Sequence, residues 1–249
     1  MAYLINVQTN LANAVQTIAG MIGQPAPPDP AGSTDPSTQQ MVTACNQAAS
    51  DLYAMRDWQE LRQQLTLTIV GDVASQSEKS FNLPSDYGRF VDATQWSAQQ
   101  QWPAIGPISP QVWMQYLVNN LEPVTTFYWQ VRNDKLFILR PPYPTGQSFQ
   151  AYYISRGYVQ DADDSALLKN NATKNGDIFL LDGQLIILLG RVKWLEYKGF
   201  DTSAAMRDFQ LQYDSRAGSD EGAPIYNLSS RAGMPLLSVL NLPNTGYGS

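Results

Sequence analysis

Apolar residues in the N-terminal part of the chain recur at the three-to-four spacing of amphipathic helices. Residues 3–22 carry one such face, which consists of Leu4, Val7, Leu11, Val15, Ile18 and Ile22. A Pro-rich linker, residues 24–36, ends it. A second helix is expected from Asp35 and Pro36, because aspartate caps helices and proline fits the first turn. Its apolar face continues to about Arg62 and consists of Val42, Cys45, Ala49, Leu52, Met55 and Trp58.

The apolar period changes to two after this helix, which is typical of strands. Leu65, Leu67 and Ile69 alternate with Thr66 and Thr68, and residues 79–83 are the expected pairing partner of this strand. A short helix is predicted to begin at Ser109-Pro110. Residues 127–131 and 136–139 flank a turn at Asn133-Asp134 and predict a hairpin. Residues 149–154 supply a further strand.

Helical patterning returns after Tyr158. Asp182 is the expected cap of a long apolar helix that ends near Gly199, and Thr202 or Ser203 caps another. The pattern predicts an α+β protein in which N- and C-terminal helices form one bundle with an inserted antiparallel β subdomain. The expected parts are N-terminal helices (1–63), a β-rich insertion (64–156), C-terminal helices (157–221) and an extended C-terminal arm (222–249).

The predicted C-terminal arm combines prolines and glycines with many large apolar residues. Its apolar residues are Ile225, Tyr226, Leu228, Met234, Leu236, Leu237, Val239, Leu240 and Leu242. Disordered tails are usually poor in such residues, because these side chains need a core to enter. The arm therefore packs on its own domain or is buried on another chain, and we favour the second interpretation.

The surface is expected to carry little charge. Charged residues make up 15% of the chain, the net charge is −6 and the sequence pI is about 4.6. Neutral polar residues suit permanent protein–protein contact, whereas the absence of a basic run disfavours tight DNA binding. The single cysteine, Cys45, excludes an internal disulfide. No apolar stretch approaches the roughly 18 residues of a membrane span, and we expect a soluble protein made in a cytoplasm.

The composition removes most kinds of catalytic site. The chain has no histidine, one cysteine and no glycine-rich phosphate loop, so we expect no catalytic residue, cofactor or metal site. Asp161, Asp163 and Asp164 lack the spacing of a calcium loop and are interpreted as solvated loop or helix-start charges. Glycoside hydrolysis, which needs two carboxyl groups, is the catalytic class that remains open.

Aromatic residues of the predicted sheet are candidates for stacking on sugars. They are Tyr128, Trp129, Phe137, Tyr152 and Tyr153. Because neighbouring residues in a strand point to opposite faces, at most half of them share one surface. Ordinary packing in the sheet and core is the favoured interpretation.

Two short motifs frame the start of the β-rich insertion. Asp57, Trp58 and Leu61 precede the Thr-rich strand at residues 65–70. The next strand closes on a second group, which consists of Leu83, Pro84, Asp86 and Arg89. This order resembles the head-to-tail adaptor, or connector, proteins of tailed bacteriophages, especially short-tailed ones. These are framework residues in our interpretation.

Each framework residue has an expected role in holding the insertion on the helices. Trp58 and Leu61 anchor the helix end in the core, and Pro84 fixes the backbone at a corner. Asp86 bonds nearby backbone N–H groups and also meets Arg89.

The resemblance implies a structural virion protein and not an enzyme. Such adaptors form a ring, commonly of twelve subunits, at the head–tail junction of a virion that is assembled in the bacterial cytoplasm. The implied partners are the portal ring, neighbouring adaptor subunits and tail nozzle or tail-fibre proteins. Double-stranded DNA passes through the channel without specific binding, and the C-terminal arm reaches the portal or a neighbour. The alternatives are a tail or nozzle protein that binds host glycans, and a peptidoglycan hydrolase.

Overall fold

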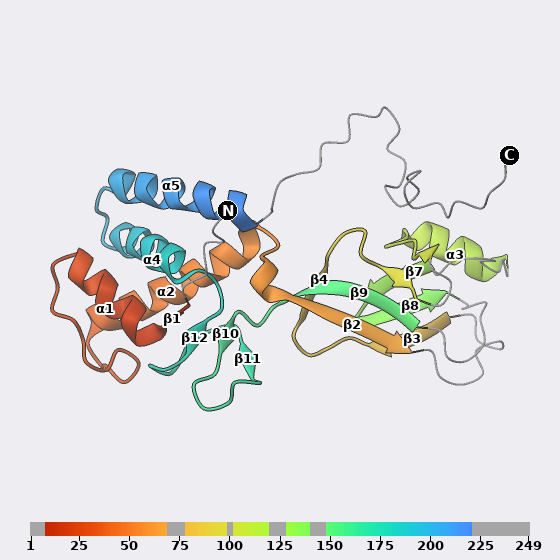
Figure 1. Cartoon of the computed structure of the whole chain (residues 1–249), viewed down its shortest axis with the longest axis horizontal. Coiled ribbons are helices and arrows are strands. Elements are labelled where there is room, and N and C mark those ends of the chain that lie inside the picture. The colour runs from red at the N-terminus through yellow and green to blue at the C-terminus, as the bar shows by residue number, and fades with distance from the viewer. Residues whose placement is uncertain (1–7, 69–77, 99–101, 120–127, 140–147, 221–249) are drawn as a thin grey trace, which may run out of the picture.

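The computed structural model describes residues 8–68, 78–98, 102–119, 128–139 and 148–220. These residues form an α+β fold with antiparallel sheets, as the sequence predicts. The molecule is elongated, with most of the helices at one end and most of the strands at the other (Figure 1). We call these two parts the helical body and the β region.

The helical body contains α1 (Leu11–Met21), α2 (Pro36–Met55), α4 (Gly183–Tyr197) and α5 (Ser203–Asp220). Helix α4 packs against the other three and is buried over most of its surface. Gly190 permits the close approach, because a Cβ atom there would lie 2.9 Å from Cδ1 of Ile18 and 3.7 Å from Sγ of Cys45. The predicted caps are present, since Asp35 accepts from the N–H of Thr38 and Asp182 from that of Gln184.

A small sheet fastens the start of the described chain to the segment before α4. It consists of β1 (Thr9–Asn10), β12 (Ile178–Phe179), β10 (Val159–Gln160) and β11 (Leu168–Lys169), in that spatial order. The predicted first helix therefore begins at Leu11 and not near residue 3, because Asn10 is in a strand and its side chain caps the helix at Asn13. The expected return of helix directly after Tyr158 is also wrong, since strands and turns precede α4.

The β region contains two antiparallel sheets. In the first, β9 (Ser148–Ser155) pairs on one side with β2 (Arg62–Thr68) and on the other with β4 (Tyr87–Phe90) and β5 (Trp96–Ser97), beyond which lies β6 (Trp102–Pro103). In the second, β8 (Lys135–Leu139) lies between β3 (Glu78–Asn82) and β7 (Tyr128–Arg132). Strands β2 and β9 lead from the helical body into the β region (Figure 1).

The expected pairing between residues 65–70 and 79–83 is wrong. Strand β2 pairs along its seven residues with β9, and β3 pairs with β8 in the other sheet. Proximity in sequence favoured a hairpin, but β9 offers β2 a long partner whose residues Phe149, Ala151 and Tyr153 are buried. The hairpin of β7 and β8 is confirmed, and Asn133 and Asp134 both adopt the left-handed backbone that a tight two-residue turn requires.

The β region has a separate core. Its buried residues are Trp129, Leu136, Ile138, Phe149 and Ala151. Helix α3 (Pro110–Val118), capped by Ser109 as predicted, lies against the second sheet through Trp113. The Trp113 indole donates to Oε2 of Glu78 at 2.9 Å, and the guanidinium of Arg132 lies over the same ring. This contact joins α3 to both β3 and β7.

Candidate interaction surfaces

Trp58 and Leu61 lie in the joint between the helical body and the β region. Helix α2 ends at Met55 and not near Arg62 as expected, and a 3₁₀ turn at Gln59–Leu61 leads into β2. The side chains of Trp58 and Leu61 are both buried in the helical core. The indole N–H of Trp58 donates to the carbonyl oxygen of Leu52 at 2.7 Å, and its ring packs edge-on against Tyr213 of α5. The joint therefore connects α2, α5 and β2.

The second motif forms the turn between β3 and β4. The carbonyl oxygen of Pro84 accepts from the N–H of Tyr87 at 3.0 Å, and Leu83 is half-buried against the β-region core. The carboxylate of Asp86 accepts from the hydroxyl of Tyr153 at 3.1 Å, and its backbone oxygen accepts from the N–H of Arg156. Burial, together with the charge and hydrogen bond of Asp86, raises the pKa of Tyr153 to about 12.

The expected contact between Asp86 and Arg89 is wrong, because Arg89 turns to the end of α2. Its Nε donates to Oδ1 of Asp57 at 2.6 Å, and its Nη2 donates to the carbonyl oxygens of Tyr53 and Arg56 at 3.3 and 3.0 Å. The guanidinium also lies over the Tyr53 ring. The last carbonyls of a helix have no partner within it. Arg89 therefore caps α2 from the β region.

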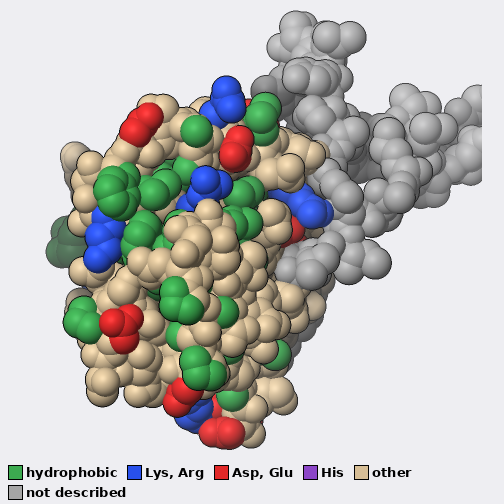
Figure 2. Space-filling view, turned by 90° about the vertical axis from the view of Figure 1, so that its left-hand side faces the viewer, with side chains coloured by type: hydrophobic (Ala, Val, Ile, Leu, Met, Phe, Trp, Pro, Cys, Tyr) green, Lys and Arg blue, Asp and Glu red, His purple; other side chains and the backbone are tan. Residues whose placement is uncertain are grey.

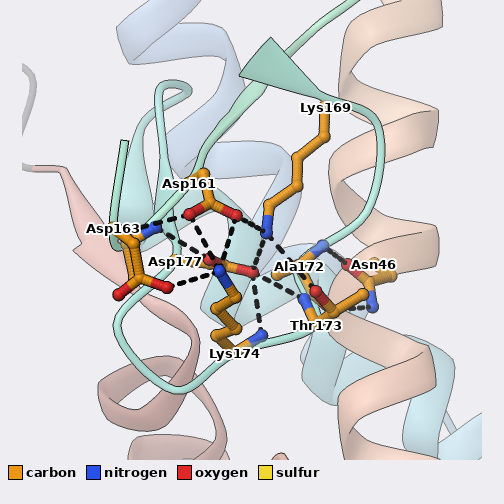
Figure 3. Close-up of polar contacts among 9 residues, drawn as sticks. Asn46, Asp161, Asp163, Lys169, Ala172, Thr173, Lys174 and Asp177 are labelled. Atoms are coloured by element: carbon orange, nitrogen blue, oxygen red, sulfur yellow. Dashed lines mark hydrogen bonds and ion pairs between the residues drawn. The ribbon is translucent and has the colours of Figure 1, made fainter. Parts of the chain in front are cut away.

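Two residues of the acidic cluster, Asp161 and Asp163, belong to an ion-pair network (Figure 3), whereas Asp164 is exposed as expected. The buried carboxylate of Asp161 forms ion pairs with the ammonium groups of Lys169 and Lys174, at 2.7 and 3.0 Å. The ammonium group of Lys169 also lies 2.7 Å from Oδ2 of Asp177, whose side chain is fully buried. The interpretation as a solvated charge is thus wrong for Asp161. Asp163 agrees with it in part, because its side chain is 78% exposed although it pairs with Lys174.

The two buried carboxyl groups of the network have lowered pKa values. For Asp161, hydrogen bonds from Lys169, from the N–H of Asp163 and from Lys174 lower the pKa. For Asp177, burial opposes ionisation, but hydrogen bonds from Lys169 and from the backbone N–H groups of Lys174, Thr173 and Ala162 together lower the pKa. Both groups are therefore ionised near neutral pH.

The network holds the segment before α4 against α2. Asn46 of α2 donates to the carbonyl oxygen of Ala172 at 3.1 Å and accepts from the N–H of Ala172 at 2.8 Å (Figure 3). The oxygens of Asp161 and Asp177 are occupied by ammonium and backbone N–H groups. Within the described ranges, no group of three or more potential ligands is arranged to hold a metal ion. A structural role explains all of these contacts.

Exposed apolar side chains occur at both ends of the elongated molecule. Tyr197, Phe200 and Met206 lie at the corner between α4 and α5, where Phe200 is 59% exposed. Figure 2 looks onto this end and shows hydrophobic side chains interspersed with Lys, Arg, Asp and Glu. At the other end, Met114 and Val118 are exposed on α3, and Val118 is 75% exposed. These are two candidate contact surfaces.

The aromatic residues considered for sugar stacking do not share one exposed surface. Trp129 and Tyr153 are buried, while Tyr128 and Phe137 are half-buried and Tyr152 is exposed. Arg132 covers the ring of Phe137 at 3.9 Å. The residues proposed for the C-terminal arm, from Ile225 to Leu242, lie outside the described residues.

Comparison with known proteins adds no relative. No protein-family model matches the chain, and comparison with curated proteins finds no match. In the part of the chain that the structure describes, no helix is both long and apolar enough to cross a membrane.

Sequence reasoning missed Lys169, Lys174 and Asp177 of the ion-pair network and the exposed apolar face of α3. Lys169, Lys174 and Asp177 are separated by ordinary loop residues, so no spacing rule groups them. A signal for α3 was present, because Met114 and Val118 stand four residues apart on a helix whose inward residue is Trp113.

Proposed function

We propose that the chain is a structural virion protein of the phage head-to-tail adaptor type. Its subunits form a ring, dodecameric by resemblance, between the portal and the tail, where the ring joins head to tail and extends the DNA channel. Genome retention and ejection are the processes it serves. Neither a catalytic step nor a cofactor is part of this proposal.

The observation that carries the proposal is an elongated subunit with an exposed apolar surface at each end. A connecting ring has to contact one assembly above it and another below it, besides its own neighbours. Surfaces at the α4–α5 corner and at α3 meet this requirement. The joint between them supports it further, because Trp58 and Arg89 fix the two parts with buried packing and hydrogen bonds. The two contacts would therefore keep a defined spacing.

The finer arrangement also belongs to this proposal. Helices from both ends of the chain form the bundle of the adaptor, residues 64–156 form the inserted subdomain, and residues 222–249 form an arm. In the assembled ring, the arm binds the portal or a neighbouring subunit through its apolar residues. Burying six aliphatic side chains contributes on the order of 10 kcal/mol before the cost of ordering the arm.

Deleting residues 222–249 tests this part directly. The shortened chain should fold and no longer join filled heads. Loss of folding would instead assign the arm to the core of its own subunit.

The charge of the chain is suited to a channel that DNA passes without being held. A net charge of −6 gives no excess of cations for phosphate neutralisation. We therefore expect a neutral or acidic inner wall in the ring. A reconstruction with a continuous lining of lysine and arginine would contradict this expectation.

Native mass spectrometry of the purified chain, alone and mixed with a portal ring of the same phage, tests the proposal. The expected result is a stable complex in which many copies of the chain bind one portal ring, and its mass gives the copy number. The matched control is the portal ring mixed with the chain that lacks residues 222–249. A full-length chain that remains monomeric and does not bind the portal ring would overturn the proposal.

A further inference from the structure

Helix α3 presents an apolar face away from the β region that it packs on. Trp113 points inward and is almost fully buried, whereas four residues at helical spacing point outward: Gln111, Met114, Gln115 and Val118. Ile105, which is also exposed, precedes the helix. We call the four outward residues of the helix the α3 face. Exposed apolar groups that gather on one face are the usual mark of a contact surface.

The sequence around the α3 face is almost free of charge. Between residues 93 and 131 the only charged side chain is that of Glu122. The exposed side of α5 differs, because Met206 and Leu211 stand among Arg207, Asp208 and Asp214. Covering α5 with an apolar segment would desolvate these charges at a cost, whereas covering the α3 face would desolvate apolar carbon and neutral amides.

A segment of the same chain has the matching chemistry. Residues 222–249 contain nine large apolar residues between Ile225 and Leu242 and one charged side chain, that of Arg231. A segment of this composition gains from an apolar surface and loses little charge solvation on binding it. The α3 face and the C-terminal arm therefore suit each other, because both carry apolar side chains and both are nearly free of charge.

The arm also begins at a suitable place. Helix α5 reaches the joint, where Tyr213 packs on Trp58, and ends at Asp220 (Figure 1). From the joint, the seven-residue strand β2 runs about 23 Å into the β region that carries α3. For 28 residues, random-coil dimensions correspond to a root-mean-square length of about 29 Å. Because this length is similar to the span, the effective concentration of the arm at the α3 face is on the order of millimolar.

The geometry points to a fold-back contact: in the free chain, residues 222–249 cover the α3 face of the same molecule and shield Met114 and Val118. Tethering favours the chain's own arm over that of a second copy at micromolar concentration. This inference does not require the virion function. If the chain is an adaptor, the contact keeps the α3 face and the apolar residues of the arm covered until a partner ring displaces the arm.

Crosslinking of paired cysteines in the full-length chain tests the contact. The native Cys45 is silent toward maleimides, because it is fully buried and burial raises its pKa to about 12. One variant carries Gln115→Cys on the α3 face with Ser238→Cys in the arm. The matched control carries Gln210→Cys on the exposed side of α5 with the same Ser238→Cys. Chains of two isotopic masses are mixed at about micromolar concentration and treated with a short bismaleimide, so that mass separates links within a chain from links between chains.

We expect the Gln115 pair to form links within one chain about tenfold faster than the Gln210 pair. Adding Met114→Asp and Val118→Asp should reduce this rate to that of the control, whereas Leu211→Asp should not. Equal rates for the two pairs would overturn the inference, as would links found only between chains. The comparison of the two cysteine pairs needs no apolar substitution, so it stands even if the aspartate variants fold poorly.

Discussion

The helical body and the β region differ in where their charged residues lie. The helical body buries the carboxylates of Asp161 and Asp177, which pair with the partly exposed Lys169 and Lys174. The β region has a smaller apolar core, and its α3 face lies in a stretch with one charged residue. A buried ion network makes a structure intolerant of change, because each group depends on its partners. A neutral surface is easily desolvated and suits binding.

This contrast assigns different work to the two parts. In the proposed ring, the helical body would be the fixed support and would contact one partner through the α4–α5 corner, while the β region would present the α3 face at a fixed distance from it. Arg89 joins the parts, because it stands on β4 and caps the end of α2.

The largest effect is expected from Phe149→Ala in the core of the β region. Phe149 is fully buried and packs near Phe90 and Trp129, so the truncation should lower the free energy of unfolding by about 3–5 kcal/mol. Hydrogen exchange should show lost protection in β3, β7 and β8 while α2 and α4 remain protected, because the helical core is separate. Simultaneous loss of protection in both parts would contradict the separation. Tyr152→Ala, at an exposed position of the same strand, is the control and should cost about 1 kcal/mol or less.

Asp177→Ala should weaken the helical body by about 3 kcal/mol. The substitution leaves Lys169 with one carboxylate and removes the acceptor of three backbone N–H groups, those of Ala162, Thr173 and Lys174. Urea unfolding followed by circular dichroism measures the loss. Asp163→Ala removes an exposed partner of the same network and should cost less than about 1 kcal/mol. Similar costs for the two variants would mean that burial does not set the strength of the network.

The same network predicts how stability depends on pH. The pKa values of Asp161 and Asp177 are lowered by folding, so their contribution is complete above the unfolded value of about 3.9 and is lost as the pH falls through the folded values. The pKa values of Lys169 and Lys174 are raised, so their contribution is complete below about 10.4 and is lost as the pH rises through the folded values.

We therefore expect the urea midpoint of the helical body to stay constant from about pH 5.5 to 8 and to fall below about pH 4. Asp177→Asn should flatten the acid limb. A marked decline between pH 8 and 6 would contradict the account, because the chain has no histidine to titrate there.

The smallest effect concerns the joint. Arg89→Lys keeps a positive charge but loses the planar fork that bonds Asp57 and the carbonyl oxygens of α2, and should cost about 1 kcal/mol. Asp57→Ala removes only the exposed ion pair and should cost less. The midpoints of thermal unfolding of the two variants show which substitution destabilises the protein more. The reverse order would mean that the ion pair, and not the capping of α2, is the stronger link.

Local signals in the sequence were enough for most helices and for one hairpin. Asp35, Ser109 and Asp182 each marked the start of a helix, and Asn133-Asp134 marked the turn of β7 and β8. Cap and turn chemistry depends on neighbours a few residues away, so such signals are legible in one chain. The α+β class followed from these elements.

Contacts between distant residues could not be predicted in the same way. The pairing of β2 with β9 brings Arg62 opposite Ile154, and no local pattern fixes such a register. The two-residue strands of the small sheet are too short to show a period. In the candidate site, Trp58 and Leu61 lie in the core as the sequence predicts. Arg89 does not pair with Asp86, the acidic residue near it in sequence, but with Asp57, which is 32 residues away.

Cryo-EM reconstruction of the head–tail junction in virions that contain this chain tests the central claim most directly. The account predicts a ring of copies directly beneath the portal, with the helical body and the β region at different heights along the channel and residues 222–249 in contact with the portal or a neighbouring subunit. A junction without the chain, or the chain located in another part of the virion, would contradict the account.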